Sequence, residues 1–321
     1  MLDWLFIAKK LKALGIIGMN ARNYKIISKL NKRSLYPLVD DKIQTKALAV
    51  KAGICVPKQI SLIEYQYQVK NFQNLLKDYT EFVIKPAHGS GGKGVLVIKN
   101  WNNDCFITTS NKKLTYAEVY QHISNILSGL YSLGGQYDIA LIEEIVHFSD
   151  VFSQFSFRGV PDVRIIVYKG YPVMAMMRLA TAESLGRANL HQGAVGVGLD
   201  IQTGKTLNAV QHNIPVTIHP DTKAELSNLC VPFWKEHLLI AAKAYEMTGL
   251  GYLGADIVLD KDKGPMMLEL NARPGLAIQI ANSKGLKDVI KKVDKFYPQN
   301  LTPEERLDFL FKKPTSRNER K

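Results

Sequence analysis

Apolar runs with strand-like spacing mark two parts of this chain. Short β-branched runs at residues 81–86 and 95–99 flank a glycine-rich segment, which predicts a β-hairpin. Residues 254–260 and 267–275 read as two adjacent strands. The chain is therefore expected to contain β-sheet in both regions.

Helical spacing marks three further segments. It predicts helices over residues 116–130 and 233–248, and Gly249 ends the second one. Residues 1–32 combine near-helical apolar spacing with several lysines. We expect this N-terminal helix to pack on the body of the protein; a membrane-surface or partner-docking helix is the less favoured alternative. Its apolar stripe consists of Trp4, Leu5, Ile7, Ala8, Leu11 and Leu14.

Three oxygen-bearing side chains fall on the second strand pair. Glu269 and Asn271 are two residues apart, so a strand directs both to one face, and Asp256 lies on the adjacent strand. A carboxylate in such an apolar run is costly unless it is paired or bound to a metal. Oxygen ligands without His or Cys suit magnesium, which usually bridges protein carboxylates and substrate phosphates. The sequence predicts a magnesium site, with salt-bridged carboxylates as the alternative.

A glycine-rich turn joins the strands of the predicted hairpin. Gly89, Gly91 and Gly94 satisfy the dinucleotide pattern G-x-G-x-x-G, but a strand follows where that pattern requires a helix. Walker and kinase-type loops do not fit the placement of Lys85 and Lys93 either. What remains is a flap whose backbone N–H groups can fold over phosphates, with these lysines adding positive charge. The flap consists of His88, Gly89, Ser90, Gly91, Gly92, Lys93 and Gly94, with His88 expected only to pack the loop.

Three blocks of sequence occur in the order typical of the ATP-grasp superfamily. They are residues 41–57, residues 83–95, and Asp256 together with residues 269–276. Between them, residues 142–146 resemble the hinge strand that holds adenine in that superfamily. The chain resembles the superfamily over residues 15–290.

A further segment narrows the resemblance. Arg187-Ala188-Asn189-Leu190-His191-Gln192-Gly193 is similar to the R-x-N-L-H-x-G segment of RimK-like α-L-glutamate ligases. The resemblance implies an α+β chain with the ATP-grasp fold, in which two α+β subdomains clasp ATP between them. The expected division is a short helical N-terminal extension, a first subdomain with flap and hinge, a second subdomain with the magnesium site, and a C-terminal helix and tail, at residues 1–35, 36–145, 146–290 and 291–321.

The resemblance also implies which residues bind the nucleotide. Lys42 and Lys85 match the two lysines that such enzymes place on nucleotide phosphates, and Lys46 is the rival of Lys42. The alternative for Lys42 is a solvated residue at a helix N-terminus. Glu144 matches the carboxylate of the adenine hinge. The hinge segment is Glu143, Glu144 and Ile145, in which Glu143 has the alternative of an ordinary strand-edge charge.

Magnesium, or manganese, is expected on Asp256, Glu269 and Asn271, with two ions bound. Arginines match positions where relatives hold a transferring phosphate or a substrate carboxylate. An arginine on an apolar strand such as V-M-A-M-M-R-L also needs a buried anionic partner. Arg273 replaces the serine of many relatives, and its role is left open. The predicted catalytic set is Arg164, Arg178, Arg187, Asn189 and Arg273, and His191 is either a proton relay or a donor that orients a ligand.

The implied chemistry is ATP-dependent ligation of a carboxylate to an amine through an acyl phosphate, which depends on cations and positioning rather than on a protein nucleophile. By resemblance, glutamate or a related amino acid is added to a peptide or protein. The alternatives are a small-molecule ligase of the glutathione or D-alanine ligase type, and an inactive ATP-binding scaffold at a membrane surface. The sequence leaves the oligomeric state open.

Composition agrees with an enzyme of the cytoplasm. The chain has 321 residues, long enough for a large core, and no apolar stretch of membrane-spanning length. Three cysteines without metal-type spacing favour a reduced compartment. The net charge of +13 suits anionic substrates. It would attract nucleic acid equally, but no nucleic-acid-binding motif is present, so no such partner is expected.

Overall fold

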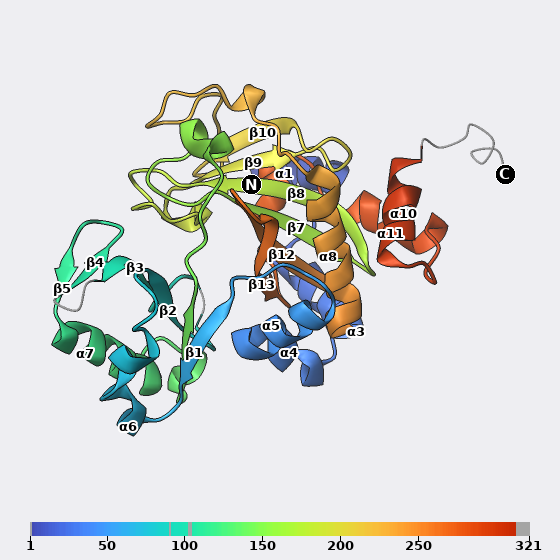
Figure 1. Ribbon diagram of the computed structural model, residues 1–321. Helices are drawn as coiled ribbons and strands as arrows, with labels where there is room; N and C mark the ends of the chain where they lie inside the picture. The colour runs from blue at the N-terminus through green and yellow to red at the C-terminus, as the bar shows by residue number, and fades with distance from the viewer. Residues whose placement is uncertain (1, 90, 102–104, 313–321) are drawn as a thin grey trace. The chain divides into compact units, whose positions relative to one another are not determined.

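The computed structural model describes residues 2–89, 91–101 and 105–312, which divide into two compact units (Figure 1). The small unit comprises residues 40–47 and 56–147. The large unit contains the rest of the described chain, including the residues before 40 and after 147. Helix α5 (Lys42–Lys51) runs from one unit into the other.

The small unit is built on a six-stranded antiparallel sheet with the strand order β1-β6-β2-β3-β4-β5. The predicted hairpin around the glycine-rich turn is confirmed as β2 and β3, which pair antiparallel. The strands are β1 (Gln59–Ile63), β2 (Phe82–Pro86), β3 (Leu96–Trp101), β4 (Phe106–Thr108), β5 (Lys113–Leu114) and β6 (Ala140–Glu143).

Helix α7 (Tyr116–Leu127) covers this sheet together with the short helix α6 (Gln66–Val69). Thr115 and Glu118 form a reciprocal capping box that fixes the start of α7. The helix ends three residues before the predicted Leu130, because Gly129 has the positive φ of 81° that terminates helices. Its apolar face and the sheet bury one core, with Phe72, Phe82, Phe106, Val119, Ile123 and Ile126 fully enclosed.

The large unit is built on a seven-stranded antiparallel sheet with the order β11-β10-β9-β8-β7-β12-β13. The predicted strand pair of the oxygen-bearing residues is confirmed as β12 and β13. The strands are β7 (Asp162–Tyr168), β8 (Tyr171–Leu179), β9 (Val195–Leu199), β10 (Thr206–Gln211), β11 (Ile214–Pro215), β12 (Tyr252–Asp260) and β13 (Gly264–Asn271). Both units therefore confirm the expected α+β class.

Helix α8 (Trp234–Thr248) packs against the central strands of the large sheet, as Figure 1 shows. Its predicted end is confirmed, since Gly249 adopts a left-handed conformation with φ 67°. Three further helices complete this unit, and the first two share the core cluster of β7 and β8. They are α9 (Ala277–Ala281), α10 (Lys287–Phe296) and α11 (Pro303–Phe311).

The N-terminal residues begin with helix α1 (Leu2–Ala13). The expected packing of its apolar stripe is wrong at three positions, because Ile7, Leu11 and Leu14 are 53%, 45% and 43% exposed. The stripe residues Trp4, Leu5 and Ala8 lie outside the described side chains. Among the helices that the structure describes, none combines the length and the apolar content that crossing a membrane requires.

After α1 the N-terminal segment is held tightly to the large unit. The Leu14 carbonyl accepts from Gly285 N–H at 2.8 Å, and Gln279 bonds both backbone groups of Ile17. A turn of π-helix (Arg22–Ile27) follows, flanked by the short helices α2 (Met19–Ala21) and α3 (Ser28–Leu30). A 3-10 turn (Arg33–Leu35) and helix α4 (Pro37–Asp40) lead into α5.

Candidate active site

Two buried lysines converge on one carboxylate in the small unit. Glu143 ends β6, where its Oε2 contacts Lys46 Nζ and its Oε1 contacts Lys85 Nζ. Lys85 comes from the neighbouring strand β2 and Lys46 from helix α5, and each lysine is only 8% exposed. When all three groups are ionised, two cations face one anion. The cluster therefore carries one positive charge that a further anion would balance.

The burial of this cluster has opposite effects on its members. Burial lowers the pKa of Lys46, and the favourable charge of Glu143 only partly offsets that effect. Burial acts to raise the pKa of Glu143, but Lys85 and Lys46 outweigh it and hold the pKa below its ordinary value. Glu143 is thus an ion at neutral pH. An additional anion near Lys46 would stabilise its ammonium form.

The two hinge glutamates differ in environment. The alternative of a strand-edge charge for Glu143 is wrong, because β6 lies between β1 and β2 and the side chain is buried in the ion cluster. Glu144 follows the strand, where its N–H donates to Lys58 O at 2.9 Å and its carboxylate lies 3.6 Å from Lys58 Nζ. Ile145 is half-buried beside it.

The base of the flap is anchored by hydrogen bonds within the small unit. Lys42 Nζ donates to the carbonyls of Ala87, at 3.3 Å, and of Gly89, so it is not the solvated residue of the alternative. His88 does more than pack the loop: its Nδ1 lies 2.8 Å from Oδ1 of the fully buried Asp138. Burial acts to raise the pKa of Asp138, but hydrogen bonds from Ser132 and His88 outweigh it and leave the pKa below its ordinary value.

The tip of the flap is rich in glycine because its backbone adopts left-handed conformations. Gly91, Gly92 and Gly94 have positive φ angles of 64°, 72° and 72°. A Cβ on Gly94 would lie 2.6 Å from the ring of Tyr131. Lys93 between them is exposed. The predicted Ser90 lies outside the described residues.

A row of charged side chains crosses four neighbouring strands of the large unit. Arg178 on β8 lies opposite Asp162 on β7, and Arg164 on β7 lies opposite Asp256 on β12. Asp256 in turn lies opposite Glu269 on β13. Because residues two apart share a face of a strand, Asp162 and Arg164 point the same way. The strand register thus brings together five charged side chains that lie within a stretch of 108 residues, from Asp162 to Glu269.

Asp256 is the centre of this row. Arg164 Nε donates to Asp256 Oδ1 at 2.6 Å, and Arg178 Nη2 donates to Asp256 Oδ2 at 2.8 Å. Arg178 also forms a two-pronged pair with Asp162, at 2.5 Å for each bond. Both arginines have the buried anionic partners that their strands require, and both oxygens of Asp256 accept guanidinium hydrogen bonds.

Burial and neighbouring charges shift the pKa values of Asp162 and Asp256 in opposite directions. Burial raises the pKa of Asp162 to about 6, with the neighbouring Asp256 charge adding to the effect and Arg178 opposing it. Burial acts the same way on Asp256, but Arg164 and Arg178 outweigh it and hold its pKa well below the ordinary value. Asp256 therefore remains ionised, whereas Asp162 takes up a proton in mild acid.

The predicted magnesium ligands lie together but are not equivalent. Glu269 has 35% of its side chain exposed, and Asn271 Nδ2 donates to its Oε1 at 3.2 Å. Arg164 Nη2 lies 4.0 Å from the same oxygen. Glu269 and Asn271 fit a hard cation as partly open oxygen donors. Asp256 fits only if it shares its oxygens between a cation and the guanidinium groups. No cluster of three His, Cys, Asp or Glu side chains able to hold a metal occurs among the described residues.

The predicted R-x-N-L-H-x-G residues form a separate loop of the large unit. Arg187 and His191 are exposed, and Asn189 Oδ1 accepts from His191 N–H at 3.0 Å to cap a short turn. Thr181 closes the base of the loop by donating to Gly193 O at 2.9 Å. Gln211 on β10 donates from Nε2 to the same Gly193 carbonyl at 2.9 Å and so ties the loop to the large sheet. The link of the loop to the charged row remains a prediction.

Several members of the site were not predicted. Asp162 could have been found, because it precedes Arg164 by two residues on an apolar strand and so shares its face. The convergence of Lys46 on Glu143 joins residues 97 apart, and nothing in the local pattern indicates it. Asp138 precedes β6 without any motif that marks it as the partner of His88.

A family model described as sugar-transfer associated ATP-grasp matches residues 21–295 of this chain. A probable alpha-L-glutamate ligase of Trichodesmium erythraeum (strain IMS101) is 25% identical over 263 residues, which are 81% of this chain and 64% of that protein. Another of Thioalkalivibrio sulfidiphilus (strain HL-EbGR7) is 31% identical over 145 residues, or 45% and 36% of the two chains.

Among solved structures, the D-alanyl-alanine synthetase A from Vibrio cholerae O1 biovar eltor str. N16961 is similar at 11% identity with a TM-score of 0.48. The match covers 80% of this chain and 64% of that one. The chain thus spans less than two thirds of the length of each of these three proteins.

Proposed function

The chain belongs to the sugar-transfer associated ATP-grasp family, and from that premise we propose that it is an ATP-dependent ligase that joins a carboxylate to an amine and releases ADP and phosphate. The expectation of an ATP-grasp, RimK-like chain is confirmed by the family match and the two curated relatives. The observation that carries the proposed activity is the cluster of Lys46, Lys85 and Glu143. A buried site with one cation in excess suits a nucleotide phosphate.

In this proposal Lys46 and Lys85 hold the phosphates of ATP. Lys46 replaces Lys42 in that role, because Lys46 shares Glu143 with Lys85 while Lys42 Nζ donates to two flap carbonyls. Glu143 keeps the two ammonium groups close together without the nucleotide. The backbone N–H groups of the flap cover the phosphates, and the positive φ angles of its glycines allow consecutive N–H groups to turn toward one anion.

Adenine is assigned to the segment after β6, with Glu144 and Ile145 lining it. Glu144 is half-buried at the end of the strand, so it can accept from the base amine or the ribose while keeping its backbone bond to Lys58. Glu143 has no part in that contact, because both its oxygens hold lysines.

Magnesium would be held by Glu269 and Asn271, with Asp256 as the third oxygen ligand. When bound, the cation neutralises phosphate charge during phosphoryl transfer. Manganese in its place and a second ion belong to the same proposal. Arg164 and Arg178 keep Asp256 ionised and fixed, so we assign them to positioning. The exposed Arg187, Arg273 and His191 are assigned to substrate.

The reaction then needs no protein nucleophile. A carboxylate oxygen of one substrate attacks the γ-phosphorus of ATP, the bond to the β-phosphate oxygen breaks, and ADP leaves. The amine attacks the resulting acyl phosphate, phosphate leaves with the bonding electron pair, and the amine loses a proton to give the amide. Lys46, Lys85 and the flap stabilise the charge that moves onto the phosphate oxygens.

We propose glutamate as the amino acid that is added and a peptide or protein as its acceptor. The names of the two curated relatives support glutamate, and the basic balance of the chain suits acidic substrates. An acceptor attached to a sugar is compatible with the description of the family.

The test is ADP release with ATP and magnesium across a panel of amino acids, with and without extract peptides, followed by mass spectrometry. A glutamyl mass gain on a peptide supports the proposal and identifies the acceptor. ADP release with free amino acids alone moves the protein to small-molecule ligases. ATP binding without turnover rejects the ligase and favours a nucleotide-binding scaffold, for which the exposed Ile7 and Leu11 of α1 and Leu14 just after it offer a docking face.

A further inference from the structure

The second half of helix α1 is exposed to solvent. Every side chain that the structure describes between residues 7 and 14 is exposed, including the apolar Ile7, Leu11 and Leu14. Leu14 N–H donates to Lys10 O at 3.0 Å, so helical hydrogen bonding continues to Leu14. Residues three and four apart lie on one face of a helix. Ile7, Leu11 and Leu14 therefore form one apolar stripe that faces solvent, which we call the α1 stripe.

The end of α1 is fixed to the large unit. Gly15 takes a left-handed conformation with φ 69° just after the helix, and Lys287 N–H donates to its carbonyl at 3.1 Å. The backbones of Gly15 and Gly285 approach so closely that a Cβ on Gly285 would lie 1.9 Å from the Gly15 carbonyl. The helix thus leaves the large unit at a defined point.

The exposed stripe has a consequence for the stability of α1. A helix of 12 residues is marginal in water by itself, and most helices in proteins are stabilised by covering an apolar face. The three side chains of the α1 stripe are exposed, so the large unit supplies little of that cover. A surface that covers the stripe would therefore stabilise the helix as it binds.

The segment that carries the α1 stripe is strongly basic. Residues 1–33 contain eight Lys or Arg residues and one acid, Asp3. Seven of the thirteen net positive charges of the chain thus fall within about a tenth of its length. Lys9, Lys10 and Lys12 lie on α1 and are exposed, and the other five bases follow between residues 22 and 33.

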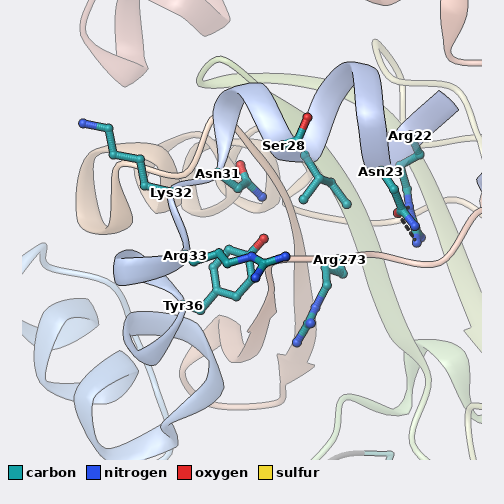
Figure 2. Close-up of a pocket in the computed structure, with 9 residues that line it drawn as sticks. Arg22, Asn23, Ser28, Asn31, Lys32, Arg33, Tyr36 and Arg273 are labelled. Atoms are coloured by element: carbon teal, nitrogen blue, oxygen red, sulfur yellow. Dashed lines mark hydrogen bonds between the residues drawn. The ribbon is translucent and has the colours of Figure 1, made fainter. Parts of the chain in front are cut away.

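Past α1, the same segment lines a cationic pocket of about 710 Å³ (Figure 2). Four of the nine lining residues are Arg or Lys and none is Asp or Glu, and three of the four are Arg22, Lys32 and Arg33. Arg22 Nη1 donates to Pro274 O at 2.8 Å, which holds the segment against the loop after β13. Figure 2 shows the exposed Lys32 directed away from the other labelled residues. A concave surface lined by one sign of charge attracts the opposite sign, so the segment favours an anionic partner.

Lysines flank the α1 stripe on both sides. Lys10 and Lys12 precede and follow Leu11 by one residue, so they are turned about 100° from it in opposite directions. Lysines in such positions lay their methylene groups along apolar surface and keep the ammonium group in water. An apolar stripe between bases is typical of helices that lie in a membrane interface, where anionic head groups attract each base. A protein partner would need an apolar groove with acids at both rims, whereas an anionic membrane offers both features along its whole surface.

We propose that α1 docks the protein on an anionic membrane surface, with the α1 stripe in the interface and Lys10 and Lys12 at the lipid head groups. The helix lies in the plane of the interface, along which its 12 residues extend about 18 Å. This contact brings the proposed ligase close to substrates held at the membrane. Docking itself does not depend on the proposed function.

The experiment is a flotation assay of the full chain with two kinds of vesicle, phosphatidylcholine alone and an equal mixture of phosphatidylcholine and phosphatidylglycerol. The wild type should float with the anionic vesicles, and added salt should weaken this binding. The double variant Ile7→Gln, Leu11→Gln should bind them at least about 10-fold more weakly, because it loses the burial of two apolar side chains. Lys10→Gln combined with Lys12→Gln should weaken binding about 10- to 30-fold, since each base near the surface contributes separately.

Two matched controls separate the α1 stripe from general surface effects. Leu207→Gln combined with Ile214→Gln changes a comparably exposed Leu and Ile on β10 and β11. Lys70→Gln combined with Lys77→Gln removes two exposed lysines of the small unit. Both control variants should bind the anionic vesicles like the wild type.

Two results would overturn the proposal. One is a wild type that floats with neither kind of vesicle, which would point to an acidic protein as the partner of the α1 stripe. The other is binding that is equal on both kinds of vesicle, or equal in the wild type and the folded Ile7→Gln, Leu11→Gln variant. Thermal unfolding shows whether the variants are folded, which the exposure of the substituted side chains favours. Vesicle binding without ADP release would reject the ligase and retain the docking, and ADP release without vesicle binding would do the reverse.

Discussion

Arg164 and Asp256 face each other across β7 and β12 and form a two-pronged ion pair, with Nε 2.6 Å from Oδ1 and Nη2 against Oδ2. Arg178 adds a third contact from β8. This carboxylate is therefore neutralised by the protein itself. The side chain of its neighbour Glu269 is partly exposed. Of the two acids of the proposed magnesium site, Asp256 therefore mainly balances the arginines, and Glu269 is the one that is open to a cation.

The first prediction separates those tasks. Asp256→Asn leaves two buried guanidinium groups without their shared anion, and breaking a buried pair in this way costs about 3–5 kcal/mol of unfolding free energy. Glu269→Gln removes a partly exposed charge and should cost less than about 1 kcal/mol. Both variants should lose ADP release. Urea unfolding and the ADP assay measure the two effects, and equal stability losses would contradict the division.

The second prediction concerns pH and Asp162. The unfolded chain releases this proton near the ordinary pKa of 3.8, whereas the folded chain keeps it to about pH 6. Between these values the unfolded state binds fewer protons, so the free energy of unfolding falls as pH rises. The difference between 3.8 and about 6 corresponds to roughly 3 kcal/mol.

Asp162→Asn should remove that slope, because asparagine resembles the protonated carboxyl at every pH. Unfolding free energies of both proteins between pH 4 and pH 6 give the comparison. Wild type should lose stability relative to the variant across the window and stay parallel to it above. A constant difference from pH 4 to pH 6 would show that Asp162 is already ionised at the acid end.

Local pattern predicted those parts of the molecule that depend on neighbours in sequence. The strand pairs around the flap and around Asp256 follow from their apolar runs, and α8 ends at Gly249 because a glycine can take the left-handed conformation. The magnesium alternatives also came from one local fact, an acid in an apolar strand. The structure confirms the salt-bridged alternative for Asp256, whereas magnesium on Glu269 and Asn271 stays a prediction.

Contacts between segments far apart in the sequence could not be predicted from local patterns. Glu143 looked like an edge charge because its lysine partner on α5 is 97 residues away. The cationic pocket depends on Arg22 reaching Pro274 across 252 residues, and R-N-Y-K-I-I carries no mark of a π-helical turn. Apolar spacing in α1 predicted packing, but spacing alone does not say whether a face meets the body or solvent, and Ile7 and Leu11 are exposed.

The third prediction tests the phosphate cluster. Lys46→Met and Lys85→Met should each weaken ATP binding about 10- to 100-fold, since each removes a charge-assisted hydrogen bond of about 1.5–3 kcal/mol. Lys51→Met, at an exposed position of the same helix α5, is the matched control and should bind ATP like the wild type. Titration calorimetry measures all three. If Lys42→Met weakens binding more than Lys46→Met does, the assignment of Lys46 over Lys42 is wrong.

The fourth prediction uses the two ends of the flap tip. Gly91→Ala places a side chain at φ 64° with no atom within 4 Å of the new Cβ, so the cost should be only the left-handed strain of about 1–2 kcal/mol. Gly94→Ala adds to the same strain a contact of 2.6 Å with the Tyr131 ring, which packs against the small unit's core. Gly94→Ala should therefore destabilise the protein more than Gly91→Ala and also weaken ATP binding, because the ring or the flap must move. The Tyr131→Ala background removes the clash. In that background Gly94→Ala should lower the unfolding free energy, relative to Tyr131→Ala alone, by only as much as Gly91→Ala lowers it relative to the wild type. Equal losses in the two single variants would mean that the flap yields freely at Gly94, and that Tyr131 does not fix its position.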